Sequence, residues 1–158
     1  MALFDEPAFH RWRDTAVTHL DAARHNRGVA DHVAVFLAEE AAQCMLKGLL
    51  HGTGGINRAW GHAVLELTDH ARVHAGLDLD EDVESGLRGL AREYQATHYP
   101  DAPPSGTLAD QIDDHDADRA IETVAALMDR VDRRFAELQQ AAADARSQDA
   151  EGNDGNNP

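Results

Sequence analysis

The sequence predicts an all-α protein, an antiparallel bundle of four to five helices. Five stretches carry apolar residues three and four positions apart, which is helical spacing. No stretch combines the alternation of apolar and polar residues with the enrichment in β-branched residues that is typical of a strand. With 158 residues and 42% hydrophobic content, the chain can bury one core. We therefore expect one helical domain over residues 1–140 and a disordered acidic, polar tail over residues 141–158.

The first two helices are delimited by proline and glycine. The first is predicted to begin just before Pro7, because proline suits the first turn and the acids beside it favour a helix N-terminus. It ends near Gly28, and a second, mostly apolar helix follows from about Val29 to Leu50. Glycines at 52–55 end the second helix, and they lack the Gly-Lys-Ser/Thr ending of a phosphate-binding loop.

Two amphipathic helices are predicted next. The third, from about Asn57 to Ala75, has its apolar residues four, three and four positions apart on one buried face: Trp60, Val64, Leu67 and Ala71. The fourth begins in the acidic cluster at 78–82. It should end at Thr97 or His98, because Tyr99 precedes a proline and is biased away from helical geometry.

The last helix has the strongest periodicity in the chain and is predicted from about Asp113 to Gln140. Its apolar residues are Ile121, Val124, Met128, Val131, Phe135 and Leu138. The segment 100–106 before it is rich in turn residues and is expected to be an ordered loop. From about Ala141 onward aromatic and β-branched residues disappear, which predicts the tail.

The composition is acidic and nearly free of lysine. The formal charge is −15, from 29 acidic and 14 basic residues, and Lys47 is the only lysine. We infer a halophilic source, with an ordinary acidic cytosolic protein as the alternative. Such a surface repels nucleic acid in dilute buffer. At 1 M salt the Debye length falls to about 3 Å, so a local pocket of arginine and histidine could still bind RNA.

The compartment is predicted to be the cytoplasm. Cys44 is the single cysteine, which excludes an internal disulfide and suggests a small buried apolar residue. The first residues lack the basic and apolar regions of a signal peptide, and no apolar run approaches about 18 residues. We expect no membrane partner.

Arg92 and His98 form the main candidate catalytic site. Cleavage of RNA without a metal needs a base for the 2′-hydroxyl and a cation for the phosphorane, and His98 and Arg92 suit these roles. Six positions lie about 120° apart around an ideal helix, so convergence requires a break before His98, which Pro100 would supply. In the enzyme interpretation, we expect Tyr99 to be an accessory phosphate contact. In the alternative, Arg92 pairs with Glu93 or Asp101, and His98 packs at a helix end.

Other polar residues are weaker candidates. Lys47 is a candidate contact for a nucleotide phosphate, or a lysine that extends from a buried helix toward solvent. Trp12 and Trp60 could stack on bases, but helical spacing favours core or interface positions. A stripe at every fourth position could ligate Zn²⁺ or Ni²⁺, but a solvated polar face is the simpler interpretation: His62, Glu66, His70 and His74. We expect no metal and no cofactor.

Three segments, taken in order, resemble the HEPN family of small helical proteins. The second helix has an aromatic, acidic or amide positions and a lysine, namely Phe36, Glu39 or Glu40, Gln43 and Lys47. Gly61-His62 through Leu67 is similar to the start of the third HEPN helix. Tyr94 through Asp101 is similar to the Tyr-x-x-x-Arg-Tyr-Pro-Asp of many archaeal members, with His98 in place of that arginine. The resemblance covers residues 8 to 138.

This resemblance implies a homodimer and two kinds of function. HEPN proteins act as ribonucleases with an Arg-x(4 to 6)-His motif, which Arg92 and His98 satisfy, or as partners of minimal nucleotidyltransferases in toxin–antitoxin-like modules. The resemblance to archaeal members also implies an archaeal source, and specifically a haloarchaeal one. The competing interpretation is a non-catalytic module that binds a nucleotide or a protein partner. A purely structural adaptor would bind neither RNA nor nucleotide.

Overall fold

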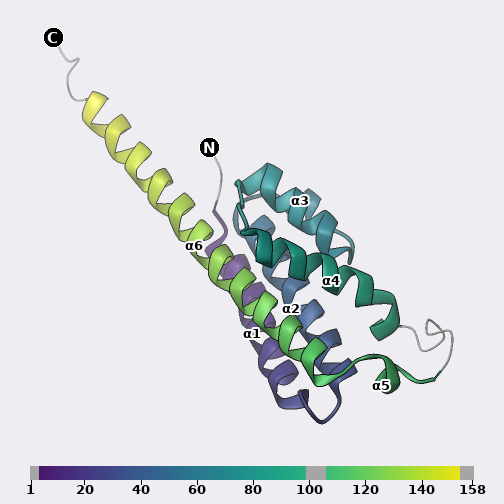
Figure 1. Ribbon diagram of the computed structural model, residues 1–158. Coiled ribbons are helices and arrows are strands. Elements are labelled where there is room, and N and C mark those ends of the chain that lie inside the picture. Colours follow the sequence, from purple (N-terminus) through teal and green to yellow (C-terminus); the bar gives the residue numbers. More distant parts are fainter. Residues whose placement is uncertain (1–3, 99–105, 154–158) are drawn as a thin grey trace.

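The structure is a bundle of helices (Figure 1). It is a computed structural model that describes residues 4–98 and 106–153. Within them the elements are α1 (Glu6–Asn26), α2 (Asp31–Gly52), the 3₁₀ turn η1 (Ile56–Arg58), α3 (Val64–Ala75), α4 (Glu81–His98), α5 (Leu108–Gln111) and α6 (Asp114–Asn153). The all-α antiparallel bundle is confirmed. None of these helices is long and apolar enough to cross a bilayer.

Helix α2 is the central element. It packs against α1, α3, α4 and α6, and 14 of its 22 residues are buried. A helix enclosed on all sides needs apolar residues around its circumference, and the run from Ala41 to Leu50 provides them. Two of its buried residues, Glu39 and Gln43, are polar. These two are the start of the candidate site described below.

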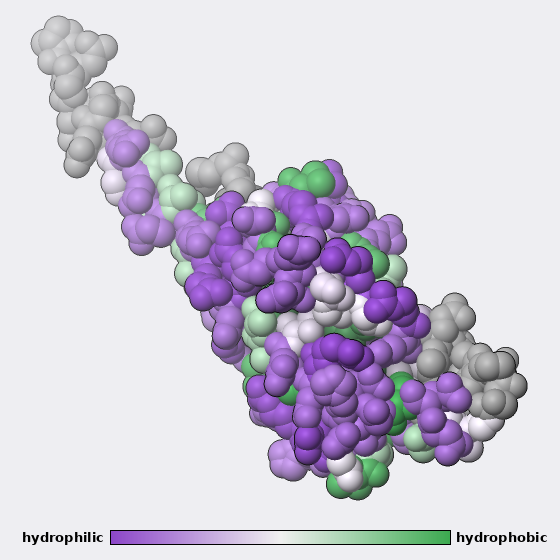
Figure 2. Space-filling model, viewed as in Figure 1, coloured by the Kyte–Doolittle hydropathy of each residue, from purple (hydrophilic) through white to green (hydrophobic). Residues whose placement is uncertain are grey.

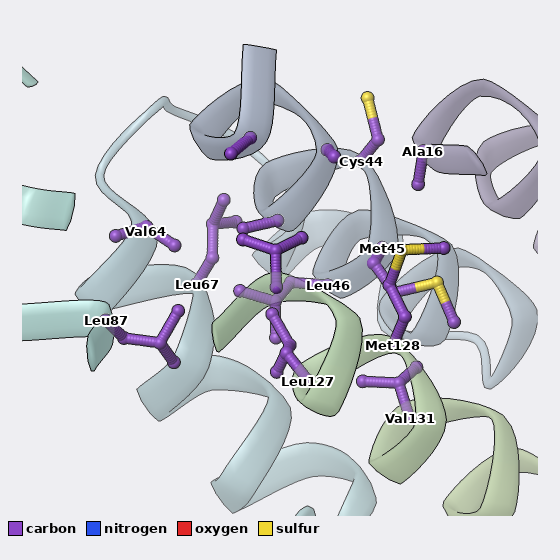
Figure 3. Packing of buried hydrophobic residues seen from close by; sticks show 14 of the residues in the cluster. Ala16, Cys44, Met45, Leu46, Val64, Leu67, Leu87, Leu127, Met128 and Val131 are labelled. Carbon is purple, nitrogen blue, oxygen red and sulfur yellow. The ribbon is translucent and has the colours of Figure 1, made fainter. Parts of the chain in front are cut away.

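The hydrophobic core lies between α2 and the helices around it. Figure 3 shows buried side chains from four helices in one cluster, among them Met45 and Leu46 of α2, Leu67 of α3, Leu87 of α4 and Leu127 of α6. All five side chains are almost completely buried. Cys44 is also buried, as predicted, and burial raises the pKa of its thiol to about 11. The apolar faces expected from helical spacing therefore form one continuous core.

Several helix ends agree with the local signals in the sequence. The Asp5 carboxylate caps α1 by accepting a 2.9 Å hydrogen bond from the backbone N–H of Ala8, and Pro7 lies in the first turn. Helix α3 ends at Gly76, whose φ of 62° is the left-handed conformation that glycine adopts without strain. Helix α4 ends at His98, as the proline at 100 predicted.

The start predicted for the third helix, near Asn57, was wrong by about two turns. Residues 56–58 form η1, and α3 begins only at Val64. The intervening residue Trp60 is therefore not on the buried face of a helix, and 78% of its surface is exposed. Gly61, with a φ of 89°, separates η1 from α3 because this backbone conformation cannot continue a right-handed helix. The other three predicted apolar residues of that face, Val64, Leu67 and Ala71, are buried.

The C-terminal helix is longer than the sequence predicted. Helix α6 continues to Asn153, past the expected end at Gln140, and its last turns extend beyond the bundle (Figure 1). The segment that was predicted to be a disordered tail from residue 141 is helical as far as residue 153. Its residues 141–148 are mostly exposed. Alanine, arginine and glutamine in this segment favour a helix without burial. The short helix α5, which the sequence did not predict, precedes α6.

Two arginines, Arg13 in α1 and Arg27 just after it, form ion pairs with α6. Arg13 donates two hydrogen bonds from Nε and one from Nη2 to the Asp132 carboxylate, at 2.8–3.0 Å. Arg27 pairs with Asp118 near the other end of α1. Arginine suits these sites because its planar guanidinium matches a carboxylate with two donors.

Most of the visible surface of the molecule is hydrophilic (Figure 2).

Candidate functional site

His98 stands at the end of α4 with its ring between two aromatic side chains. The ring of Tyr94, one turn earlier, stacks on it with centroids 4.0 Å apart, and Phe36 of α2 lies at 4.5 Å. Nδ1 lies 2.8 Å from the backbone carbonyl oxygen of Tyr94. Because a carbonyl can only accept, Nδ1 must donate, and Nε2 is the nitrogen left for chemistry.

That Nε2 faces two carboxylates of α2. It lies 3.4 Å from Oε1 of Glu40 and 3.9 Å from Oε2 of Glu39. We call Glu39, Glu40 and His98 the Glu–His cluster. Only 1% of the Glu39 side chain is exposed, against 28% for Glu40 and 15% for His98. The cluster therefore extends from the interior of the bundle to its surface.

A chain of hydrogen bonds holds the buried carboxylate. The Nε2 amide group of Gln43, one helical turn from Glu39, donates to both of its carboxylate oxygens, at 2.9 and 2.8 Å. The Oε1 atom of Gln43 in turn lies 3.0 Å from Nδ1 of His62, which donates to it. Burial raises the pKa of Glu39 to about 7, and the hydrogen bonds from Gln43 oppose this rise. Glu39 therefore changes its charge near neutral pH.

A cavity of about 290 Å³ opens beside the cluster. Its walls come from Glu39 of α2, from His62 and the first residues of α3, and from Ala91 and Tyr94 of α4. Most of this lining is apolar, with one carboxylate at the buried end and an imidazole at the rim. A pocket of this kind gives a small solute access to Glu39.

The predicted convergence of Arg92 with His98 is not present within this chain. Residues 81–98 form one continuous helix, so the expected break before His98 is absent. Arg92 is exposed, and its Nη2 lies 3.9 Å from the position that a Cβ on Gly89 would occupy, which directs it back along α4. His98 points toward α2 instead. Two residues six positions apart on an unbroken helix face directions about 120° apart.

Lys47 lies outside the Glu–His cluster, about two turns further along α2 than Glu40. Its Nζ is 5.8 Å from the centre of the Trp12 ring, and Trp12 stacks on His51. These residues, with Ile56 and Trp60, line a second cavity of about 420 Å³, which we call the Lys47 cleft. Tyr99, the accessory phosphate contact predicted from the sequence, lies outside the described residues.

The predicted histidine stripe, which begins at His62 and continues into α3, does not assemble a metal site among the described residues. His62 bonds to Gln43, His70 to the backbone carbonyl of Arg58, and His74 to that of Thr53. Within the described part of the chain, one group brings three His, Cys, Asp or Glu ligand atoms within 4.8 Å of one another, and it is the Glu–His cluster. The interpretation of the stripe as a metal site is therefore not supported by the geometry.

The cluster unites the three sequence segments that carry the family resemblance. Phe36, Glu39, Glu40 and Gln43 come from the first segment, His62 from the second, and Tyr94 and His98 from the third. Sequence reasoning assigned no chemistry to Glu39 or Gln43. The signal was a glutamate and a glutamine four positions apart inside an apolar helix, because buried polar groups at this spacing can satisfy each other.

The protein is a small all-α domain with a polar centre. In this centre the buried carboxylate of Glu39, on the central helix α2, faces His98. The HEPN domain model matches residues 9–146, and the chain belongs to the HEPN domain family. The match continues past residue 140, as α6 does.

Two solved structures share this fold. TT1696 from Thermus thermophilus is 31% identical, with a TM-score of 0.71 over 80% of this chain and 97% of that one. ST0689, described as an archaeal HEPN homologue, is 24% identical, with a TM-score of 0.64 over the same shares of the two chains. No curated protein matches the chain.

Proposed function

We propose that this protein is a binding component of a two-component, toxin–antitoxin-like module, and that it docks a nucleotidyltransferase-type protein. The observation that carries the proposal is the exposed apolar surface at η1. Trp60 is 78% exposed and Ile56 53%, and both line the Lys47 cleft. Exposed tryptophan is typical of the residues that dominate protein interfaces. A nucleotidyltransferase-type partner is the occupant that the HEPN resemblance implies.

The Lys47 cleft also suits a nucleotide as a second ligand of the same module. Trp60 offers an exposed ring on which a base can stack, and Lys47 is the only lysine of the chain. Lys47 can contact a phosphate from the wall of the cleft. In high salt only such local charge attracts a phosphate, because the long-range repulsion from a net charge of −15 is screened.

The experiment is a binding titration, in 2 M KCl, between the purified protein and the product of the neighbouring gene, once the sequence of that product has been checked for the pattern of a nucleotidyltransferase. Trp60→Ala is expected to weaken binding at least tenfold, because truncation of a central interface tryptophan typically costs about 2 kcal/mol or more. Val29→Ala is the matched control, since Val29 is 83% exposed in the α1–α2 connection, away from the cleft. Absence of binding, or equal affinity of Trp60→Ala and the parent, would overturn the proposal.

A second candidate is metal-independent endoribonuclease activity in a homodimer. The observation that favours it is the exposure of the Arg92 side chain at the surface of α4, where a second copy of the chain can reach it. In this proposal Arg92 of one subunit joins His98 of the other around one RNA backbone. The divergence of the two residues within one subunit makes the dimer a requirement.

Cleavage of RNA by the purified protein in molar KCl tests this candidate. His98→Ala and Arg92→Ala should each abolish cleavage while the circular dichroism spectrum stays helical. Mixing the two inactive variants should restore one composite site per heterodimer and part of the activity. No cleavage by the parent protein, or a monomer in sedimentation at the working concentration, would exclude it.

A further inference from the structure

The Glu–His cluster places three hydrogen-bond acceptors against one another. Nδ1 of His98 carries a proton because it donates to the Tyr94 carbonyl, so neutral His98 presents a lone pair on Nε2. Glu40 and Glu39 direct carboxylate oxygens at this lone pair from 3.4 and 3.9 Å. Three facing acceptors need either a proton or a cation between them.

The spacing of these atoms fits a metal ion. Ligand bonds to Zn²⁺ are about 2.0–2.2 Å long, which places neighbouring tetrahedral donor atoms about 3.3–3.6 Å apart. The Nε2 atom of His98 is 3.4 Å from one glutamate oxygen and 3.9 Å from the other, and all three donors lie within 4.8 Å of one another. Bringing Nε2 of His98 and the Glu39 oxygen from 3.9 Å to this spacing needs a shift of a few tenths of an ångström, and the two carboxylate oxygens lie at most 4.8 Å apart.

The surroundings of the donors are those that hold metal ligands in place. A ligating histidine usually donates its other nitrogen to a carbonyl or carboxylate, and His98 donates to the Tyr94 carbonyl. Ligating carboxylates are usually hydrogen-bonded in turn, and Gln43 donates to both oxygens of Glu39. Phe36 and Tyr94 fix the plane of the imidazole. This support distinguishes the cluster from acidic residues that are adjacent only by chance.

We propose that Glu39, Glu40 and His98 bind a divalent transition-metal ion. Two carboxylates and one imidazole suit Zn²⁺ or Mn²⁺ better than Mg²⁺ or Ca²⁺, which prefer oxygen ligands alone. The cavity beside Glu39 and the partial exposure of Glu40 give the ion access and leave positions for water. The inference goes beyond the proposed partner docking and does not depend on it.

The test is calorimetric titration of the full chain, freed of metal with EDTA and dialysed, with ZnCl₂ and with MnCl₂ as probes. One tight site per chain is expected, with a rise in the melting temperature. Glu40→Gln should weaken that site at least tenfold, and so should His98→Gln. Glu40 is partly exposed, so its substitution should not prevent folding, which circular dichroism will verify.

Surface histidines can also bind Zn²⁺, so the matched control is Glu66→Gln with His70→Gln. These two residues form the other glutamate–histidine pair that faces solvent, with 4.0 Å between Nε2 and the carboxylate. The control should retain the tight site. Loss of binding in the control but not in Glu40→Gln would place the metal on α3 and overturn the proposal. Equal, weak binding by all variants would mean that the cluster holds only a proton, which would also overturn it.

Discussion

Glu39→Gln should remove a pH-dependent loss of stability that the buried carboxylate causes in the metal-free protein. Burial raises the pKa of Glu39 from 4.5 to about 7. Between these values the folded state binds more protons than the unfolded state, so stability falls as the pH rises through this window. The groups that face Glu39 are Glu40 and Lys47 on α2 and His98 on α4. A glutamine at 39 does not ionise and can still pair with Gln43.

The magnitude follows from the two pKa values. Each pKa unit corresponds to about 1.36 kcal/mol, so a shift of about 2.5 units sets a ceiling near 3 kcal/mol. From pH 5 to pH 8.5 the parent should lose about 2.5 kcal/mol that the variant keeps. Other titrating groups are common to both proteins and cancel in the difference.

Urea unfolding at fixed KCl concentration, with EDTA present, measures this difference at each pH. Glu137→Gln is the control with the opposite sign, because Arg134 lowers the pKa of Glu137 and its contribution is lost only toward acid pH. The reasoning fails if the stability difference between Glu39→Gln and the parent varies by less than about 0.5 kcal/mol between pH 5 and 8.5.

Three further outcomes are expected. Gly86→Ala should destabilise the protein by about 1–3 kcal/mol in urea unfolding, because a Cβ there would overlap the Thr123 side chain where α4 crosses α6; an unchanged midpoint would contradict this contact. Deletion of residues 141–158 should leave the melting temperature within about 2 °C of the parent, because residues 141–148 are mostly exposed; a large drop would place the end of the domain beyond 140. Raising KCl from 0.1 to 2 M should increase the melting temperature, since a net charge of −15 repels itself less when screened; a decrease would argue against adaptation to salt.

Periodicity predicted the helices and much of the core because each helix buries one face or, in α2, nearly all of them. Val124, Met128, Val131 and Phe135 are buried on α6 as their spacing indicated. The end of α6 was missed because a polar, alanine-rich helix that projects from the bundle has no apolar stripe to mark it. Trp60 was misplaced because its spacing from Val64 matched a helix, although Gly61 lies between them with a positive φ.

The site was harder to predict than the fold. His98 was identified from the sequence, but its partners were expected along α4 and lie across the bundle on α2 instead. Local spacing gives the direction of a side chain around its own helix, and it does not say which helix stands opposite. Glu39 and Gln43 carried a local signal, because an apolar helix holds them one turn apart. His62 reaches Gln43 only through the packing of α3.

The two proposals that involve His98 make competing demands on one lone pair. As a general base, the imidazole must leave Nε2 available for the 2′-hydroxyl proton of RNA. As a metal ligand, it donates the same lone pair to the ion, because Nδ1 is already committed to the Tyr94 carbonyl. The carboxylates of Glu39 and Glu40 favour a cation at this position, whether proton or metal, and a metal ion would exclude the base. A nuclease that uses His98 must therefore be inhibited by the ion that the cluster binds.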